Sequence, residues 1–156
     1  MTIAVLLAVA AWWMGLFPPL TERDWRPVST TFAVCGQSSG RAAGCVVDGD
    51  SLLIGFGKDR RRIRLTGYDA PELDGACEAE SKRAIEARDA LAAWLSKAPF
   101  QWDGGDEPPR DQYGRELREV SRPDQQGNRE YLAETMIARG LASANGWGDV
   151  AVDWCE

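Results

Sequence analysis

The four cysteines constrain the fold most strongly, because they stand at positions 35, 45, 77 and 155 of a 156-residue chain. No two of them form a C-x-x-C pair, so two disulfides are a better interpretation than a structural zinc site. Three pairings of four cysteines exist. Cys35 and Cys45 bracket a turn-rich stretch that suits a hairpin closed by a short bridge, which leaves Cys77 for Cys155. The even count favours disulfides over the alternative of four buried free thiols.

An apolar segment opens the chain. Residues 1–20 carry no charge, and residues 3–17 are apolar apart from one glycine, until Pro18 and Pro19 end the run. The length of this apolar run lies between that of the hydrophobic region of a signal peptide and the ~18 residues of a membrane-spanning helix. Residues 1–20 are therefore expected to be a signal peptide or an N-terminal membrane anchor. Residues 21–29 are then expected to be a linker, and residues 30–156 one domain. Membrane association through residues 1–20 is a further expectation.

The location of the domain is predicted from conflicting signals. Arg23 and Arg26 follow the apolar segment and favour a cytoplasmic position for the chain after it. Disulfides persist only in an oxidising compartment, and we give the cysteines more weight. An extracytoplasmic protein, periplasmic or secreted, is therefore expected.

The chain contains no histidine, which excludes a Ser-His-Asp triad, a Cys-His pair and the common His-ligated zinc sites. Any catalysis must use carboxylates, arginines, lysines, tyrosines or a metal ion bound by oxygen. The net charge of −6 disfavours passive coating of nucleic acid, whose non-specific affinity comes from Lys and Arg. A polyanionic substrate would have to be bound locally.

Hydrophobic periodicity predicts an α+β domain. Short strands are expected at 30–34, 45–48, 51–56, 62–66, 100–103 and 116–121. Helices are expected at 78–97, with Ala84, Ile85, Leu91, Ala92 and Leu95 on the apolar side, and at 129–139, with Gly140 as the C-cap. A small, partly open barrel with helices packed against it accommodates this order.

Opposite charges are concentrated in adjacent segments. Residues 58–64 contain five basic residues and one acidic residue, and residues 65–80 contain five acidic residues and no basic one. The simpler interpretation of such charge runs is a solvent-exposed face without a specific function. The arginines at positions 60–62 likewise fit two interpretations. They either protect an exposed edge strand from pairing with other chains or bind along a nucleic acid.

Carboxylates and arginines recur in an order that suits one site. Asp48-Gly49-Asp50 precedes a strand, Arg64 lies on the next strand, and Asp69-Ala70-Pro71-Glu72 follows that strand. Asp111-Gln112-Tyr113-Gly114-Arg115 then supplies a second arginine. Carboxylates for a hard cation, one more for a base, and two arginines for a phosphate are the inventory of metal-assisted phosphodiester hydrolysis without histidine.

With these motifs the sequence resembles the staphylococcal (micrococcal, thermonuclease-type) nuclease family over about residues 45–145. The pieces that match are 47–51, 63–65, 69–72, 111–115 and 132–142, in the family's order. The resemblance implies an oligonucleotide/oligosaccharide-binding (OB) fold, a five-stranded β-barrel with packed helices. It also implies a calcium-dependent endonuclease that hydrolyses DNA, RNA or both, expected here as a monomer.

The resemblance also implies roles for individual residues. Asp50 and Asp69 would ligate Ca²⁺ through their carboxylates, and Ala70 through its backbone carbonyl. Arg64 and Arg115 would bind the scissile phosphate, Glu72 would activate the attacking water, and Tyr113 would bind a phosphate of the strand.

Two alternatives to this enzyme remain. One is a catalytically weak nucleic-acid- or protein-binding OB module of the same fold. The other is an acidic calcium-binding structural domain, which would leave the two arginines without a role. The complete set of carboxylates and arginines favours the enzyme.

Overall fold

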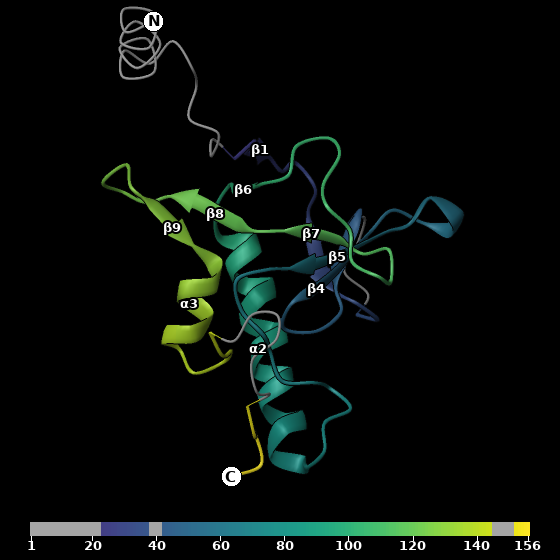
Figure 1. The fold of residues 1–156 in the computed structure, drawn as a ribbon, viewed down its shortest axis with the longest axis vertical. Helices are drawn as coiled ribbons and strands as arrows, with labels where there is room; N and C mark the ends of the chain where they lie inside the picture. The colour runs from purple at the N-terminus through teal and green to yellow at the C-terminus, as the bar shows by residue number, and fades with distance from the viewer. Residues whose placement is uncertain (1–22, 38–41, 145–151) are drawn as a thin grey trace, which may run out of the picture.

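Two β-sheets and two α-helices make up the described part of this computed structural model, which comprises residues 23–37, 42–144 and 152–156 (Figure 1). The predicted α+β class is therefore confirmed. The apolar segment expected as a signal peptide or anchor at 1–20 lies outside these residues. None of the helices in the described ranges is long and apolar enough to cross a membrane.

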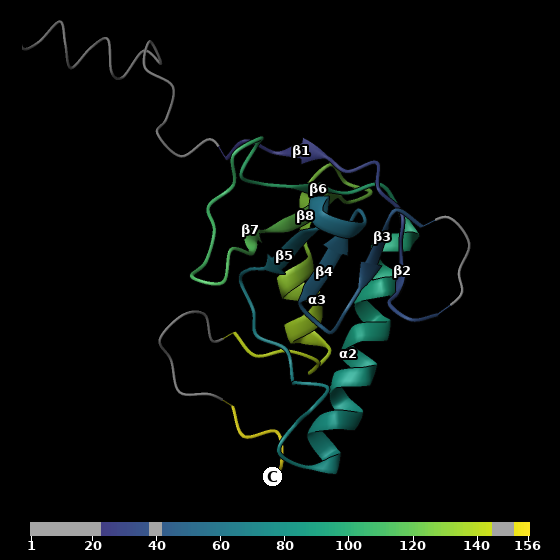
Figure 2. The same cartoon turned by 90° about the vertical axis from the view of Figure 1, so that its right-hand side faces the viewer.

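The first sheet has five strands, and β5 lies inside it rather than at an edge. Its order is β2 (Phe32–Val34), β3 (Gly44–Val46), β4 (Ser51–Ile54), β5 (Arg61–Leu65) and β7 (Glu116–Arg118). Figure 2 shows β2 to β5 side by side. β4 pairs antiparallel with both β3 and β5, whereas β7 joins β5 in parallel. Because β7 pairs only with residues 63–65 of β5, the edge-strand interpretation of the arginines at 60–62 stays a prediction.

The second sheet has four strands in the order β1 (Arg26–Pro27), β6 (Gln101–Trp102), β8 (Val120–Pro123) and β9 (Arg129–Tyr131). Only Glu119 separates β7 from β8, so one extended segment passes from the first sheet into the second. The single strand expected at 116–121 is therefore two strands. No ladder closes the five-stranded sheet on itself within the described ranges, so they show two sheets and not a closed barrel.

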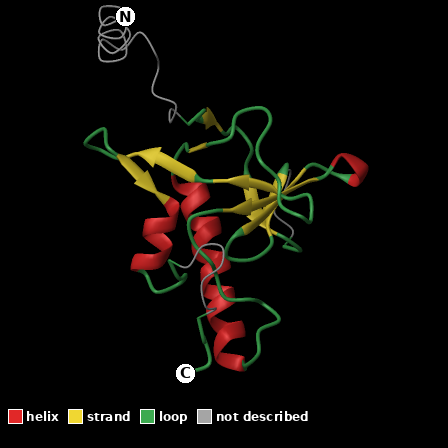
Figure 3. Ribbon diagram, viewed as in Figure 1, coloured by secondary structure: helices red, strands yellow, loops and turns green. Residues whose placement is uncertain are grey.

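A single 3-10 turn, η1 (Gly57–Asp59), connects β4 to β5 and projects away from the sheet (Figure 3). Gly55 and Gly57 adopt φ angles of +78° and +60°, which allow the chain to reverse at this point. Phe56 lies between these two glycines and is 76% exposed.

α2 (Glu78–Lys97) has the predicted bounds. Its first turn is capped by Cys77, whose sulfur accepts a hydrogen bond from the backbone N–H of Glu80 at 3.4 Å. Ala84, Leu91 and Leu95 are buried as expected. Ile85 was expected on the same apolar side but is 44% exposed, because one residue after Ala84 the helix has turned by about 100° away from the core.

α3 (Leu132–Ala138) is shorter than the helix expected at 129–139. Residues 129–131 pair with β8 as strand β9, so a strand replaces the first turn of the predicted helix. The C-cap residue is Arg139, and the glycine predicted as the C-cap follows it at the C′ position. Gly140 has φ +66° and donates its backbone N–H to the carbonyl of Ile137 at 2.9 Å.

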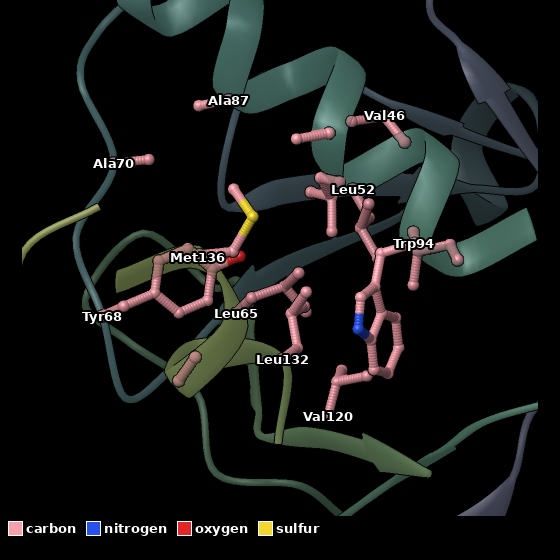
Figure 4. Close-up of a cluster of buried hydrophobic side chains, with 14 of the residues drawn as sticks. Val46, Leu52, Leu65, Tyr68, Ala70, Ala87, Trp94, Val120, Leu132 and Met136 are labelled. Atoms are coloured by element: carbon pink, nitrogen blue, oxygen red, sulfur yellow. The ribbon is translucent and has the colours of Figure 1, made fainter. Parts of the chain in front are cut away.

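The core lies between the helices and the strands (Figure 4). Trp94 from α2, Leu132 and Met136 from α3, and Leu52 and Leu65 from the first sheet are all buried. Burial of side chains of this size typically stabilises a fold by about 1.5–3 kcal/mol each. This packing fixes the start of β4 and the end of β5 against the helices.

Both predicted disulfides are present, Cys35–Cys45 and Cys77–Cys155. The expected hairpin between Cys35 and Cys45 is wrong, however, because the strands flanking it, β2 and β3, are parallel. The second disulfide ties the start of α2 to the end of the chain.

Candidate functional site

Asp50 is a buried carboxylate at the start of β4, with 2% of its surface exposed. Its Oδ2 accepts a hydrogen bond from the backbone N–H of Ala70 at 3.0 Å. Its Oδ1 accepts from Arg64 Nη1 at 2.6 Å and from the hydroxyl of Ser51 at 3.1 Å. Asp50 therefore joins three segments of the chain at one point.

Arg64 bridges the two aspartates that the sequence placed at the site. Arg64 lies directly opposite Ser51 in the β4–β5 ladder, which places its side chain beside the start of β4. Its Nη1 donates to Asp50 and its Nη2 donates to Asp69 Oδ1. One guanidinium group thus spans two carboxylates from different loops.

The loop after β5 contacts two other parts of the chain, the segment after α3 and the Asp48-Gly49-Asp50 turn. Asp69 and Ser143 exchange backbone hydrogen bonds of 3.1 and 2.8 Å. The buried hydroxyl of Tyr68 donates to the carbonyl of Gly49 at 2.9 Å. Neither Tyr68 nor Ser143 was predicted as a site residue, because nothing in the local sequence indicates contacts between residues so far apart.

Gly49 is required by close packing and not by its backbone conformation. A Cβ atom at this position would lie 2.6 Å from Ala70 Cβ and 2.9 Å from Ala87 Cβ. Figure 4 shows Ala70 and Ala87 at the same end of the core cluster. Small residues at all three positions therefore let the turn, the loop after β5 and α2 meet closely enough to place Asp50.

Glu72 lies beside this cluster and is more exposed than Asp50. Its backbone N–H donates to Glu80 Oε1 at 3.4 Å, but no described residue donates a hydrogen bond to its carboxylate. Partial burial, with repulsion from Asp48 and Asp69, raises the pKa of Glu72 above its usual value against the opposing effect of Arg64. Such a carboxylate is free to accept a proton.

The charges around Asp50 are mainly negative. Burial is the main reason that the pKa of Asp50 is raised to about 8, and the carboxylates of Asp48 and Asp69 contribute to this increase, while Arg64 and the backbone N–H of Ala70 oppose it. When all three carboxylates are ionised, the single guanidinium leaves an excess of negative charge. A bound cation would compensate for this excess.

Arg115 and Tyr113 lie on the loop before β7, apart from the Asp50–Arg64–Asp69 cluster. Arg115 Nε donates to Asp111 Oδ2 at 2.6 Å, and the backbone N–H groups of Arg115 and Tyr113 both donate to Asp111 Oδ1 at 2.9 Å. Tyr113 is 62% exposed, and the Arg115 guanidinium lies 5.5 Å from its ring centroid. Within the described ranges no hydrogen bond or ion pair joins Arg115 to the cluster.

The register of β7 predicts that Arg115 faces the same side of the sheet as Arg64. Leu117 is the register partner of Arg64, and alternate residues of a strand share a face, so the chain leading into β7 places Arg115 on that face. Asp111 holds Arg115 in this arrangement. Its role was missed in the sequence, although the i,i+4 spacing of two opposite charges was a signal for it.

The residues expected to bind a metal offer oxygen atoms only. These are the carboxylates of Asp50 and Asp69 and the backbone carbonyl of Ala70. Across the described ranges no three Asp, Glu, His or Cys side chains converge closely enough to hold an ion by themselves. By its chemistry this donor set fits a hard cation that keeps several waters, as Ca²⁺ does.

The fold and the site define a small α+β domain with an arginine-bridged acidic cluster at one end of the β4–β5 ladder. The sequence model of the staphylococcal nuclease homologue family matches residues 62–151, more than half of the chain. The chain belongs to this family. The matched region includes Arg64, Asp69, Glu72 and Arg115, whereas Asp50 precedes it. No curated protein matches the chain.

Proposed function

We propose that this protein is a calcium-dependent phosphodiesterase that cleaves DNA, RNA or both as an endonuclease. The observation that carries the proposal is the Arg64 guanidinium shared between Asp50 and Asp69. The carboxylate of Glu72, which accepts no hydrogen bond from any described residue, lies beside them. A phosphate-binding group, oxygen ligands and a candidate base are thereby gathered in one place. Membership of the nuclease homologue family supports the same reaction class.

Each residue then has a distinct task. Asp50, Asp69 and the Ala70 carbonyl would hold Ca²⁺, whose charge, when bound, stabilises negative charge on the phosphate. Glu72 accepts the proton of the attacking water. Arg64 and Arg115 donate hydrogen bonds to the phosphoryl oxygens, whose charge increases in the transition state. Tyr113 binds a neighbouring phosphate of the strand through its exposed hydroxyl.

The finer architecture and the location belong to the same proposal. We expect an OB-type five-stranded barrel, and the extended segment that passes between the sheets at Glu119 supports it. The two disulfides support an extracytoplasmic location, either periplasmic or secreted. Residues 1–20 would direct or anchor the protein there as a monomer, and the division of the chain at residues 20 and 29 stays a prediction.

A binding module of the same fold is the second candidate. It is favoured by one observation, the Asp111–Arg115 ion pair, which occupies the second arginine within its own loop. A module of this kind would bind nucleic acid or protein without requiring Glu72.

A cleavage assay on the full chain separates the two candidates. We expect plasmid DNA or RNA to be cleaved with Ca²⁺ and to stay intact in excess chelator. Glu72→Gln should lower single-turnover cleavage by ~10²-fold while leaving oligonucleotide affinity almost unchanged. Glu86→Gln, which removes an exposed carboxylate on α2, is the matched control and should change neither. Full activity in chelator, or an unaltered rate for Glu72→Gln, would refute the proposed mechanism.

A further inference from the structure

Three arginines follow one face of β5. Ile63 and Leu65 are buried, so Arg62 and Arg64 point to the opposite side of the strand. Arg60 precedes β5 in an extended conformation, with φ −65° and ψ 125°, and continues the alternation. With about 3.3 Å per residue, Arg60 and Arg64 lie roughly 13 Å apart along the strand. The face that carries Arg64 in the candidate site therefore continues toward η1.

A small pocket lies at the η1 end of this face. Its volume is about 280 Å³, and its lining includes Leu53, Phe56, Arg60 and the Cys35–Cys45 disulfide. Leu53 is the register partner of Arg62, so the pocket opens on the same face as the arginines. We call it the hairpin pocket.

The hairpin pocket combines an aromatic ring with a cation at its rim. Phe56 is 76% exposed, more than Ile85, Tyr113 or Val152, the other exposed large apolar side chains of the described ranges. Arg60 contributes the cation, and Lys58 lies two residues before it. Aromatic rings beside cations are the elements with which proteins bind single-stranded nucleic acid, by stacking on bases and pairing with phosphates.

We propose that the hairpin pocket is a base-binding subsite for a single-stranded segment of the substrate, which extends along β5 from Arg64. The inference rests on the proposed function and adds a second point of contact to it. A base would stack on Phe56. Arg60 and Arg62 would pair with the phosphates that lie between this base and the phosphate bound by Arg64. The distance along β5 is longer than one nucleotide, so a strand must extend beyond the cleaved linkage to reach the pocket.

The arginines favour a nucleic acid over an apolar protein segment as the occupant. A chain with a phosphate at each step matches guanidinium groups that recur on every second residue of β5. Arg62 already donates one Nη2 hydrogen to the carbonyl of Tyr113, which connects this row to the loop that carries Arg115. An apolar protein segment would offer no anionic group to Arg60 and Arg62.

The test compares a long and a short ligand in the full chain with the Glu72→Gln background, so that the ligands stay intact. The probes are a fluorescent single-stranded DNA of about ten nucleotides and a dinucleotide that spans only the candidate site. Phe56→Ala should weaken binding of the longer strand by about 5-fold or more and leave the dinucleotide unaffected. Phe56→Trp should retain the affinity, and Ile85→Ala, an exposed apolar control on α2, should change nothing.

Crosslinking locates the base directly. Strands with one 5-iodouridine at successive positions should crosslink to Phe56 only when that base lies beyond the linkage at Arg64. Equal affinity of Phe56→Ala and its parent for the longer strand overturns the inference, as does an equal loss for both ligands. Cleavage by the wild type is measured in parallel. If the wild type does not cleave but Phe56→Ala still weakens binding of the longer strand, the nuclease proposal is refuted and the proposed strand-binding site is supported.

Discussion

Arg64 donates a hydrogen bond from Nη1 to Asp50 Oδ1 at 2.6 Å, and this pair joins one end of the β4–β5 ladder to the most buried carboxylate of the site. The other amino group of the same guanidinium is directed to Asp69. A planar fork can donate in two directions at once, whereas an ammonium group acts as a point charge. The site therefore depends on the shape of this side chain as well as on its charge.

Arg64→Lys should lower single-turnover cleavage by ~10²-fold, because a lysine cannot bridge Asp50 and Asp69 while presenting donors to a phosphate. The measurement is cleavage of a labelled oligonucleotide with enzyme in excess, together with equilibrium binding. Arg139→Lys, at an exposed position after α3, is the matched control and should keep the wild-type rate. A rate near that of the wild type for Arg64→Lys would show that charge alone suffices.

Arg115→Ala should also lower turnover by ~10²-fold, with a smaller effect on binding, because its charge is most useful as the phosphoryl oxygens become more negative. Asp111→Asn tests whether the ion pair positions Arg115, since Asn keeps the size of the side chain but removes its charge. We expect a smaller loss of turnover for Asp111→Asn than for Arg115→Ala. Unchanged turnover in both variants would favour the binding module.

Local patterns predicted the elements whose contacts are local. The α2 bounds follow from an acidic first turn and from Pro99 after the last turn, and Gly140 marks the end of α3. Alternation of Ile63 and Leu65 with Arg62 and Arg64 predicted the two faces of β5. The disulfides followed from the positions of the cysteines.

Contacts between distant residues could not be predicted in this way. Strand β1 forms because it pairs with β6, which is far away in the sequence. Strand β9 forms because it pairs with β8 across a loop, and it therefore replaces one turn of the predicted helix. The bridge between Asp69 and Ser143 likewise depends on the fold. The association of Asp50, Arg64 and Asp69 followed from the order of the motifs, whereas the Asp111–Arg115 pair was overlooked.

Arg61→Ala should destabilise the protein by about 1–2 kcal/mol, because Glu116 would lose its bidentate partner in a buried position. Glu116 is 2% exposed, and Arg61 donates to its two oxygens at 2.8 and 2.7 Å. Arg118 also donates to Glu116 and limits the loss. Urea denaturation followed by circular dichroism measures the effect.

Arg60→Ala is the matched control for Arg61→Ala, since the two arginines are adjacent but Arg60 makes no ion pair among the described residues. Its free energy of unfolding should stay within about 0.5 kcal/mol of the wild type. Equal stability of the two variants would mean that the remaining arginines satisfy Glu116 completely.

Gly49→Ala should lower both stability, by about 1–3 kcal/mol, and cleavage, because the new methyl group collides with Ala70 and Ala87. The collision would displace the turn that carries Asp50. The second variant, Gly49→Ala with Ala87→Gly, removes one of the two contacts and should recover part of the melting temperature. A wild-type melting temperature and rate for Gly49→Ala alone would contradict this packing role.

Glu130 should make the stability of the protein depend on acidic pH. Hydrogen bonds from Arg122, followed by those from Trp94 and Thr135, lower the pKa of Glu130 to about 2 despite partial burial, which opposes them. A carboxylate with a lower pKa in the folded state than in the unfolded state stabilises the fold above its unfolded pKa. This contribution is lost as the pH falls from about 4.5 through about 2.

Glu130→Gln removes this titration while preserving the shape of the side chain. Arg122 contacts both carboxylate oxygens at 3.1 Å, but Glu130 is 37% exposed, so solvent screening reduces the expected effect to about 1–2 kcal/mol at pH 7. Urea titrations at intervals between pH 7 and pH 3 measure it, and Glu134→Gln, an exposed residue of α3, serves as the control. The stability difference between wild type and Glu130→Gln should shrink as the pH falls, because protonation of Glu130 weakens its pairing with Arg122. A difference that stays constant over this range would show that the pair with Arg122 contributes nothing that depends on the charge of Glu130.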